Sequence, residues 1–226
     1  MNKIAVFSCS KNTSKTILED SIEVINKYIK TPIEIYTKKN NKQGLSKCYN
    51  DFLYSKQASN YEYIAFVHDD VMLDDALIES KLERYHRMYD IIGIAGGNNC
   101  KIQNPAMWHI MCGGLGSGNL HGAAGHVHND KSYITAFGLW PMRVTLIDGV
   151  FMSVNVEKVK SVNWKFNENY DFHLYDISSC LDANKKRLKI GVVPIHLTHN
   201  SPGLRDINDK TFQRNNKQFL QEYSNY

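Results

Sequence analysis

Residues 63–71 read YIAFVHDDV, and this stretch decides the fold. Its five leading apolar residues are typical of a buried parallel strand. The run stops at the imidazole of His68 and the carboxylates of Asp69 and Asp70. Open α/β sheets bind ligands at the carboxyl ends of their strands, and carboxylates there suit a divalent cation that bridges phosphate oxygens. An ordinary strand end followed by a helix cap is the alternative interpretation.

Strand and helix patterns alternate through the first hundred residues. Strand patterns cover residues 4–7, 33–36, 63–67 and 90–95, and helical apolar stripes cover 16–30, 45–53 and 74–88. This alternation predicts right-handed crossovers between the strands of a mostly parallel sheet. We therefore expect an α/β protein with a Rossmann-like fold, in which helices flank a central sheet.

The alternation breaks between residues 96 and 140. This segment contains nine glycines and four histidines (His109, His121, His126 and His128), with hardly any helical or strand periodicity. A loop of this length in a compact domain is usually functional or disordered. Trp108 and Trp140 argue against simple disorder.

Regular patterns return in the last third of the chain. A strand-like run over 144–154 is interrupted by Asp148 and Gly149, and a last strand covers 189–194. Between them a helix is expected to begin near Asp176, whose carboxylate is suited to cap it. No repeat and no linker divides the chain, so we expect one domain over residues 1–226.

Composition excludes several classes of protein. A chain of 226 residues with 42% hydrophobic content can bury one substantial core, or at most two small ones. A net charge of +4 gives no broad electrostatic case for nucleic acid binding. The five cysteines are scattered without a CxxC pair, so neither a zinc ribbon nor a disulfide scaffold is indicated.

The sequence shows no targeting or membrane signal. The N-terminus lacks the apolar region of a signal peptide, and no apolar stretch approaches the ~20 residues that span a bilayer. We therefore expect a soluble protein of a reducing compartment, the cytoplasm, with no transmembrane segment. Peripheral membrane association stays open.

Five short segments carry a family resemblance. They are LSKCYN (45–50), AFVHDDV (65–71), LIDGVFM (146–152), FHLYD (172–176) and HNS (199–201). In this order, over almost the whole chain, the sequence resembles a family 2 glycosyltransferase of the GT-A fold.

The resemblance implies a division of labour and a reaction. It implies a nucleotide-sugar half over about residues 1–100 and an acceptor half over about 101–226. The reaction would be a metal-dependent, inverting transfer of a sugar from a UDP-linked donor, with Mn²⁺ or Mg²⁺ as cofactor. The acceptor hydroxyl would belong to a carbohydrate, lipid-linked or protein-linked molecule.

The same resemblance implies the donor and metal residues. His68, Asp69 and Asp70 occupy the family's DXD position, with His68 replacing the first aspartate. Asp70 matches the metal ligand, Asp69 would face the ribose or donor sugar, and His199 matches the histidine that completes the metal site. His68 would contact the nucleotide or act as a softer ligand that favours Mn²⁺. The ion would stabilise the departing diphosphate.

Nucleotide-binding residues are expected at the first strand and its loop. The uridine would lie near Phe7, Ser8 and Ser10, with Leu45 and Asn50 closing around it. A lid formed by the Pro- and Gly-containing segment after His199 would bring Arg205 to a phosphate oxygen. A solvated C-terminal helix is the alternative interpretation of that tail.

The catalytic base is expected at Asp176, which would remove a proton from the acceptor hydroxyl. Tyr175 stands where the family often has glutamate, and Ser178 replaces an acidic residue that is usual two positions after the base. Asp148, which the family places beside the donor sugar and acceptor, is the second candidate. A helix cap remains the alternative role for Asp176.

The same residues leave other functions and sites open. The spacing of His126 and His128 can chelate a metal, but an acceptor loop whose histidines and tryptophans stack on sugar rings fits the composition better than a zinc site. A nucleotidyltransferase would need a Gly-rich, basic phosphate loop, which the N-terminal region lacks. A phosphoester hydrolase would need two metals about 3.5–4 Å apart. A non-catalytic carbohydrate-binding module is the third alternative.

Overall fold

The computed structural model describes residues 4–128, 131–201 and 207–226. In chain order the elements are β1 (Ile4–Cys9), α1 (Ile17–Ile25), β2 (Glu34–Lys38), α2 (Leu45–Leu53), the 3₁₀ helix η1 (Gln57–Asn60), β3 (Tyr63–Val67), β4 (Val71–Leu73), α3 (Ile78–His86), β5 (Ile91–Gly93), β6 (Ala95–Gly97), α4 (Trp108–Met111), β7 (Leu120–His128), β8 (Lys131–Gly138), β9 (Met142–Val144), β10 (Leu146–Ile147), β11 (Phe151–Asn155), α5 (Val156–Ser161), α6 (Tyr175–Lys185), β12 (Ile190–Val192), β13 (Leu197–His199) and α7 (Lys210–Glu222).

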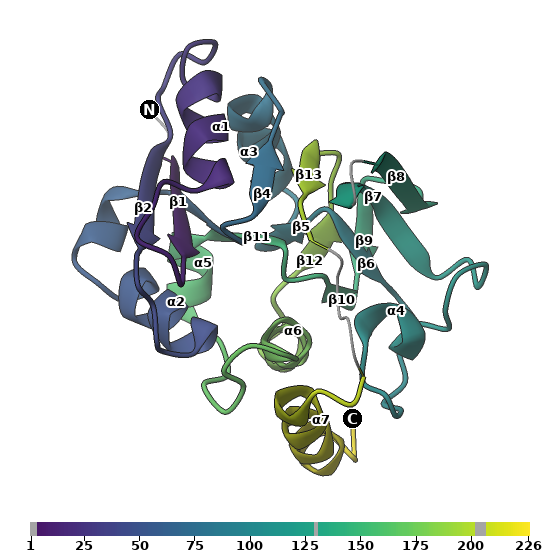
Figure 1. Ribbon diagram of the computed structural model, residues 1–226. Helices are drawn as coiled ribbons and strands as arrows, with labels where there is room; N and C mark the ends of the chain where they lie inside the picture. Colours follow the sequence, from purple (N-terminus) through teal and green to yellow (C-terminus); the bar gives the residue numbers. More distant parts are fainter. Residues whose placement is uncertain (1–3, 129–130, 202–206) are drawn as a thin grey trace.

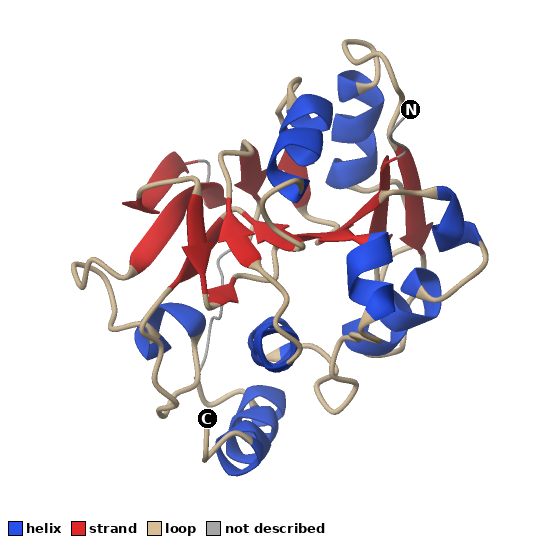
Figure 2. Cartoon of the chain, turned by 180° about the vertical axis from the view of Figure 1, so that it is seen from behind, coloured by secondary structure: helices blue, strands red, loops and turns tan. Residues whose placement is uncertain are grey.

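A seven-stranded sheet with the order β2-β1-β3-β11-β5-β12-β9 forms the centre of the molecule. Helices α1 and α3 lie on one side of this sheet, and α2 and α6 lie on the other (Figures 1 and 2). The predicted α/β class is therefore confirmed. The sheet is mixed rather than mostly parallel, because β11 runs antiparallel to both β3 and β5. The strand expected over 144–154 breaks at Asp148, and beyond the break the chain enters the first sheet again as β11.

A second sheet has the order β10-β6-β7-β13-β4, and β8 pairs with the free side of β7. The strand expected over 90–95 is divided between the sheets, with β5 in the first and β6 in the second. The expectation of hardly any regular structure over 96–140 was wrong, since this segment forms α4 and the hairpin of β7 and β8. β7 reads LHGAAGHVH, whose small residues give no strand periodicity; its three neighbouring strands hold it instead.

Helix boundaries follow from local chemistry. α2 covers the predicted residues 45–53, whereas α1 and α3 are shorter than the predicted 16–30 and 74–88. Thr16 caps α1 through a reciprocal pair of hydrogen bonds with Glu19, which places the start of that helix where the pattern predicted it. None of the described helices combines the length and apolarity needed to cross a membrane.

An aromatic core joins α2 to α6 beneath the first sheet. The Tyr49 ring lies 4.8 Å from Phe66, 5.1 Å from Phe166 and 5.8 Å from Tyr175, between ring centroids. All four residues are buried. This packing fixes the first turn of α6, where Tyr175 and Asp176 lie, against the carboxyl end of β3.

The cysteines differ from expectation at one place. Cys100 and Cys112 form a disulfide that joins the ends of the segment leading into and through α4. The scattered spacing of the cysteines did not indicate this pair, and no disulfide was expected in a protein of a reducing compartment. Cys9, Cys48 and Cys180 are free and buried.

Gly122 should tolerate no side chain, because β6 approaches β7 closely there. Its φ is +92°, and an added Cβ would lie 1.9 Å from the carbonyl oxygen of Ile94. We expect Gly122→Ala to lower the free energy of unfolding by about 2–4 kcal/mol, from backbone strain and overpacking together. Urea denaturation measures this change.

Gly116→Ala is the matched control. Gly116 also has a positive φ, of +83°, but its added Cβ would meet nothing within 4 Å among the described residues. It should cost only the backbone strain, about 1–2 kcal/mol. Equal losses for both variants would show that the close approach at Gly122 has no energetic consequence.

Candidate active site

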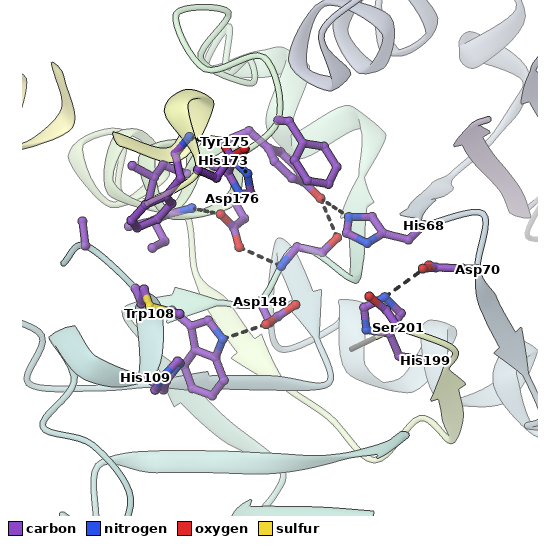
Figure 3. A pocket seen from close by; sticks show the side chains of 18 residues that line it. His68, Asp70, Trp108, His109, Asp148, His173, Tyr175, Asp176, His199 and Ser201 are labelled. Atoms are coloured by element: carbon purple, nitrogen blue, oxygen red, sulfur yellow. Dashed lines mark hydrogen bonds and ion pairs between the residues drawn. The ribbon is translucent and has the colours of Figure 1, made fainter. Parts of the chain in front are cut away.

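A cavity of about 550 Å³ opens where the two sheets meet the first turn of α6 (Figure 3). It brings together five residues that the sequence singled out from distant positions: His68, Asp70, Asp148, Asp176 and His199. His68 and Asp70 follow β3, Asp148 follows β10, Asp176 lies in the first turn of α6, and His199 ends β13. The remaining wall includes residues near α4 and α7, such as Trp108, His109, Asp209 and Phe212.

His68, Asp70 and His199 form a group suited to a metal ion. One ligand atom from each residue lies within 4.8 Å of the others, and no second such group occurs among the described residues. The antiparallel pairing of β4 with β13 sets Val71 opposite His199, which brings Asp70 to the histidine. Imidazole nitrogen and carboxylate oxygen are ligands that Mn²⁺ and related ions accept.

The polar atoms of this group fit a cation. Asp70 Oδ1 and His199 Nε2 are 3.2 Å apart, yet both are buried without a well-formed hydrogen bond to any described residue. Burial disfavours the charge of Asp70, but His199 and His68 outweigh it and hold the pKa of Asp70 below its usual value. Burial and the neighbouring His199 lower the pKa of His68, which keeps it in the neutral form that binds metals.

Tyr175 orients His68 from behind. Its hydroxyl donates to the carbonyl oxygen of Gly149 at 2.7 Å and lies 3.0 Å from His68 Nε2 (Figure 3). Since the single hydroxyl proton goes to Gly149, His68 Nε2 must donate to the tyrosine oxygen. The lone pair of the neutral imidazole is then on Nδ1. A partner that selects the tautomer and ring orientation in this way is usual behind a metal-binding histidine.

Two carboxylates stand on the other side of the cavity. Asp148 accepts a hydrogen bond from Trp108 Nε1 at 2.7 Å and another from the backbone N–H of Val150 at 2.9 Å. Asp176 accepts from the backbone N–H groups of Gly149 and Ile177, each at 2.9 Å. The turn at Gly149 therefore lies between the two carboxylates and contacts one of them directly.

Asp176 has the electrostatics of a base that works near neutral pH. Burial and the negative charge of Asp148 raise its pKa to about 7. Asp176 is not the helix cap, because Leu174 occupies that position with a φ of 67°.

The residues expected around the uridine lie at the carboxyl end of β1, away from the cavity wall. Phe7 is buried and stacks on Phe52, with ring centroids 4.4 Å apart. Ser8 Oγ is buried and finds no hydrogen-bond partner in the described part of the chain. Ser10 Oγ accepts from the backbone N–H of Asn12 at 3.2 Å.

Leu45 and Asn50 contact the segment before α6. The backbone N–H of Leu45 donates to the Asp171 carbonyl at 2.6 Å. The Asn50 amide donates to the carbonyl oxygen of Phe166 and accepts from its N–H, which gives Asn50 a structural contact. Asp69 is half-buried beside the metal group. Arg205 lies outside the described residues, as does the 202–206 part of the lid expected over 200–210.

The histidines of the 96–140 segment take separate places. His109 lines the cavity beside Trp108, and His126 lies opposite His199 on the neighbouring strand. His121 Nδ1 is buried without a partner among the described residues. The hydrogen bond of Trp108 to Asp148 was not predicted, because forty residues separate the pair and no local pattern reports their contact.

Comparison with known proteins identifies the family. No curated protein matches the sequence significantly. Among solved structures, A197 from STIV aligns with a TM-score of 0.44 and 12% identity, over 88% of this chain and 82% of that one. S. aureus TarS 1-349 aligns with a TM-score of 0.46 and 14% identity, over 88% of this chain and 61% of that one. The model of a glycosyltransferase-like family matches residues 5–223, so the chain belongs to this family and is a glycosyltransferase.

Proposed function

We propose that this protein is a metal-dependent, inverting glycosyltransferase that moves a sugar from a UDP-linked donor to a hydroxyl group of its acceptor. The observation that carries the proposal is the group of His68, Asp70 and His199 in one cavity with Asp148 and Asp176. In this proposal, residues 1–100 form the donor half and residues 101–226 the acceptor half of one domain.

The donor would lie between the metal group and the end of β1. His68, Asp70 and His199 would hold Mn²⁺ or Mg²⁺, which supplies positive charge to the diphosphate when bound. The Ser8 hydroxyl has no partner among the described residues, which supports a hydrogen bond to the nucleotide base at the end of β1. Asp69, which lies between His68 and Asp70 in sequence, would face the ribose or the donor sugar.

The acceptor would be activated by Asp176. As the acceptor oxygen attacks the anomeric carbon, its proton passes to the Asp176 carboxylate and the bond from that carbon to the diphosphate breaks. Attack from the face opposite the leaving group inverts the configuration. The hydrogen bonds from Gly149 and Ile177 hold the carboxylate in place while leaving other lone pairs of its oxygens for the proton.

Nucleotide binding should require both a metal and Asp70. In a thermal-shift panel of UDP, GDP, CDP and dTDP with Mn²⁺, we expect UDP at about 100 times its Kd to raise Tm by about 5–10 °C. The shift should disappear without metal and in Asp70→Ala, because a ligand to the ion is lost. Asp51→Ala is the control, because Asp51 is exposed and forms its ion pair with Lys47. A UDP shift that persists in Asp70→Ala would refute the metal assignment, and a nucleotide-independent response to Zn²⁺ would favour a hydrolase.

Tyr175 should support metal binding without touching the ion. Tyr175→Phe removes the hydroxyl that orients His68, so we expect Mn²⁺ affinity to fall by about 10- to 100-fold in isothermal titration calorimetry. Tyr170→Phe is the matched control, since this buried tyrosine donates to Glu222 at 2.9 Å and is absent from the cavity wall. Equal Mn²⁺ affinities for wild type and Tyr175→Phe would show that the tyrosine does not orient the histidine for metal.

The base assignment predicts both a loss of rate and a pH profile. Asp176→Asn cannot accept a proton, so kcat should fall by roughly 10²–10⁴-fold while donor affinity barely changes. In the wild type the base must be deprotonated, and its pKa is about 7. The rate should therefore rise about tenfold per pH unit below this value and level off above it.

Asp182→Asn, on the same helix and hydrogen-bonded to Tyr223, is the control for these measurements. It should leave both kcat and the pH profile unchanged. Near-normal turnover of Asp176→Asn would pass the role of base to Asp148. An equal loss of donor binding and turnover would instead place Asp176 in the donor site.

A further inference from the structure

Three side chains form a row across the second sheet, beginning at the metal group. In the pairing of β13 with β7, His199 lies opposite His126, and in the pairing of β7 with β8, His126 lies opposite Tyr133. Paired residues on neighbouring strands project from the same face of a sheet. Because His199 reaches Asp70 on this face, the row leads outward from the cavity.

Ring contacts support this geometry. The rings of His126 and Tyr133 are stacked, with centroids 5.0 Å apart and an interplanar angle of 24°. Burial and His199 lower the pKa of His126 while the charge of Asp148 opposes them, so His126 lies within electrostatic reach of both. Two strand spacings separate Tyr133 from His199, about 10 Å in all.

Phe137 gives the row a second connection to the cavity. Tyr133 and Phe137 both lie on β8, where a β-bulge sets Phe137 between Ala136 and Gly138, the partners of Ala123 and Gly122. The Phe137 ring meets the edge of Trp108 at 5.1 Å, and Trp108 donates to Asp148. The rings of His126, Tyr133, Phe137 and Trp108 are here termed the ribbon platform, which reaches the cavity wall at Trp108.

The ribbon platform is open to a ligand at its outer end. Tyr133 is 53% exposed, and in the described structure β8 pairs only with β7. An exposed aromatic ring beside polar groups suits a sugar, because the negative face of the ring attracts the polarised C–H groups of a pyranose. The half-buried His126 underneath holds the tyrosine ring in position.

The charge of the cavity indicates which sugars fit. The described lining includes four carboxylates (Asp70, Asp148, Asp176 and Asp209) and neither lysine nor arginine. An acceptor with phosphate or carboxylate groups would meet the like charges of Asp148, Asp176 and Asp209 there, since the metal ion of the proposed function is already engaged by Asp70 and the donor diphosphate. Lys131, on the same face of β8 as Tyr133, lies beyond it at the far end of the strand. An uncharged acceptor avoids this repulsion.

We propose that the ribbon platform is an acceptor subsite for an uncharged oligosaccharide of at least two sugar units. The terminal sugar presents its hydroxyl to Asp176 while a preceding sugar stacks on Tyr133. This inference rests on the proposed transferase function for the role of the terminal sugar. The stacking site itself depends only on the row of rings and the charge of the cavity.

The test is a glycan array of neutral and anionic mono- and oligosaccharides, probed with the full chain in Mn²⁺ and UDP. Wild type should bind neutral oligosaccharides, and Tyr133→Ala should bind them about tenfold more weakly, as expected for one lost aromatic contact. Tyr133→Phe keeps the ring and should bind normally. Ile134→Ala is the matched control, because Ile134 is the next residue on β8, is 75% exposed and faces the opposite side.

A second readout separates this inference from the proposed function. Tyr133→Ala should retain the Mn²⁺-dependent shift in Tm caused by UDP. It should also hydrolyse the UDP-linked donor, with water as the acceptor, at the wild-type rate. The subsite is refuted if wild type binds no neutral oligosaccharide or binds only anionic glycans. It is also refuted if wild type and Tyr133→Ala bind neutral oligosaccharides with equal affinity. Glycan binding that depends on Tyr133, in a protein without any UDP response, would uphold the subsite and refute the transferase proposal.

Discussion

The contact between Gly149 and the first turn of α6 holds the candidate site together. The Tyr175 hydroxyl donates to the Gly149 carbonyl, and the Gly149 N–H donates to Asp176. An added Cβ at Gly149 would lie 2.4 Å from the Tyr175 hydroxyl, so only glycine permits this approach. One residue, Gly149, thereby links the metal group, through Tyr175 and His68, to the candidate base. The aromatic packing of Tyr49 and Phe166 against Tyr175 keeps the contact rigid.

The charges of the site are arranged as two separate groups. Two histidines stabilise the ionised form of Asp70, whereas burial and the charge of Asp148 destabilise the ionised form of Asp176. Their pKa values consequently move in opposite directions from the same starting value. A carboxylate that stays ionised suits a cation, and one that titrates near neutrality suits proton transfer. The environment of each aspartate thus distinguishes the two roles without any difference in residue type.

Part of the first sheet could be predicted from local patterns, because β1 and β3 are short apolar runs bounded by polar residues. His68 and Asp70 could be found in the same way, since they stand directly at a strand end. Asp176 needed the family resemblance, because its local pattern fits a helix cap equally well. The bridge by Tyr175 and the bond from Trp108 to Asp148 could not be predicted, since each joins residues that approach only in the folded chain.

The glycines of β7 prevented its prediction as a strand, and they also explain its position in the site. An added Cβ at Gly125 would lie 2.9 Å from the Leu197 carbonyl, and one at Gly122 would lie 1.9 Å from the Ile94 carbonyl. Small residues therefore let β7 pack tightly between β13 and β8 on its two edges. That close pairing is what aligns His126 with both His199 and Tyr133. A regular strand of alternating β-branched residues would have been easier to predict, but side chains at these two positions would collide with the neighbouring backbone.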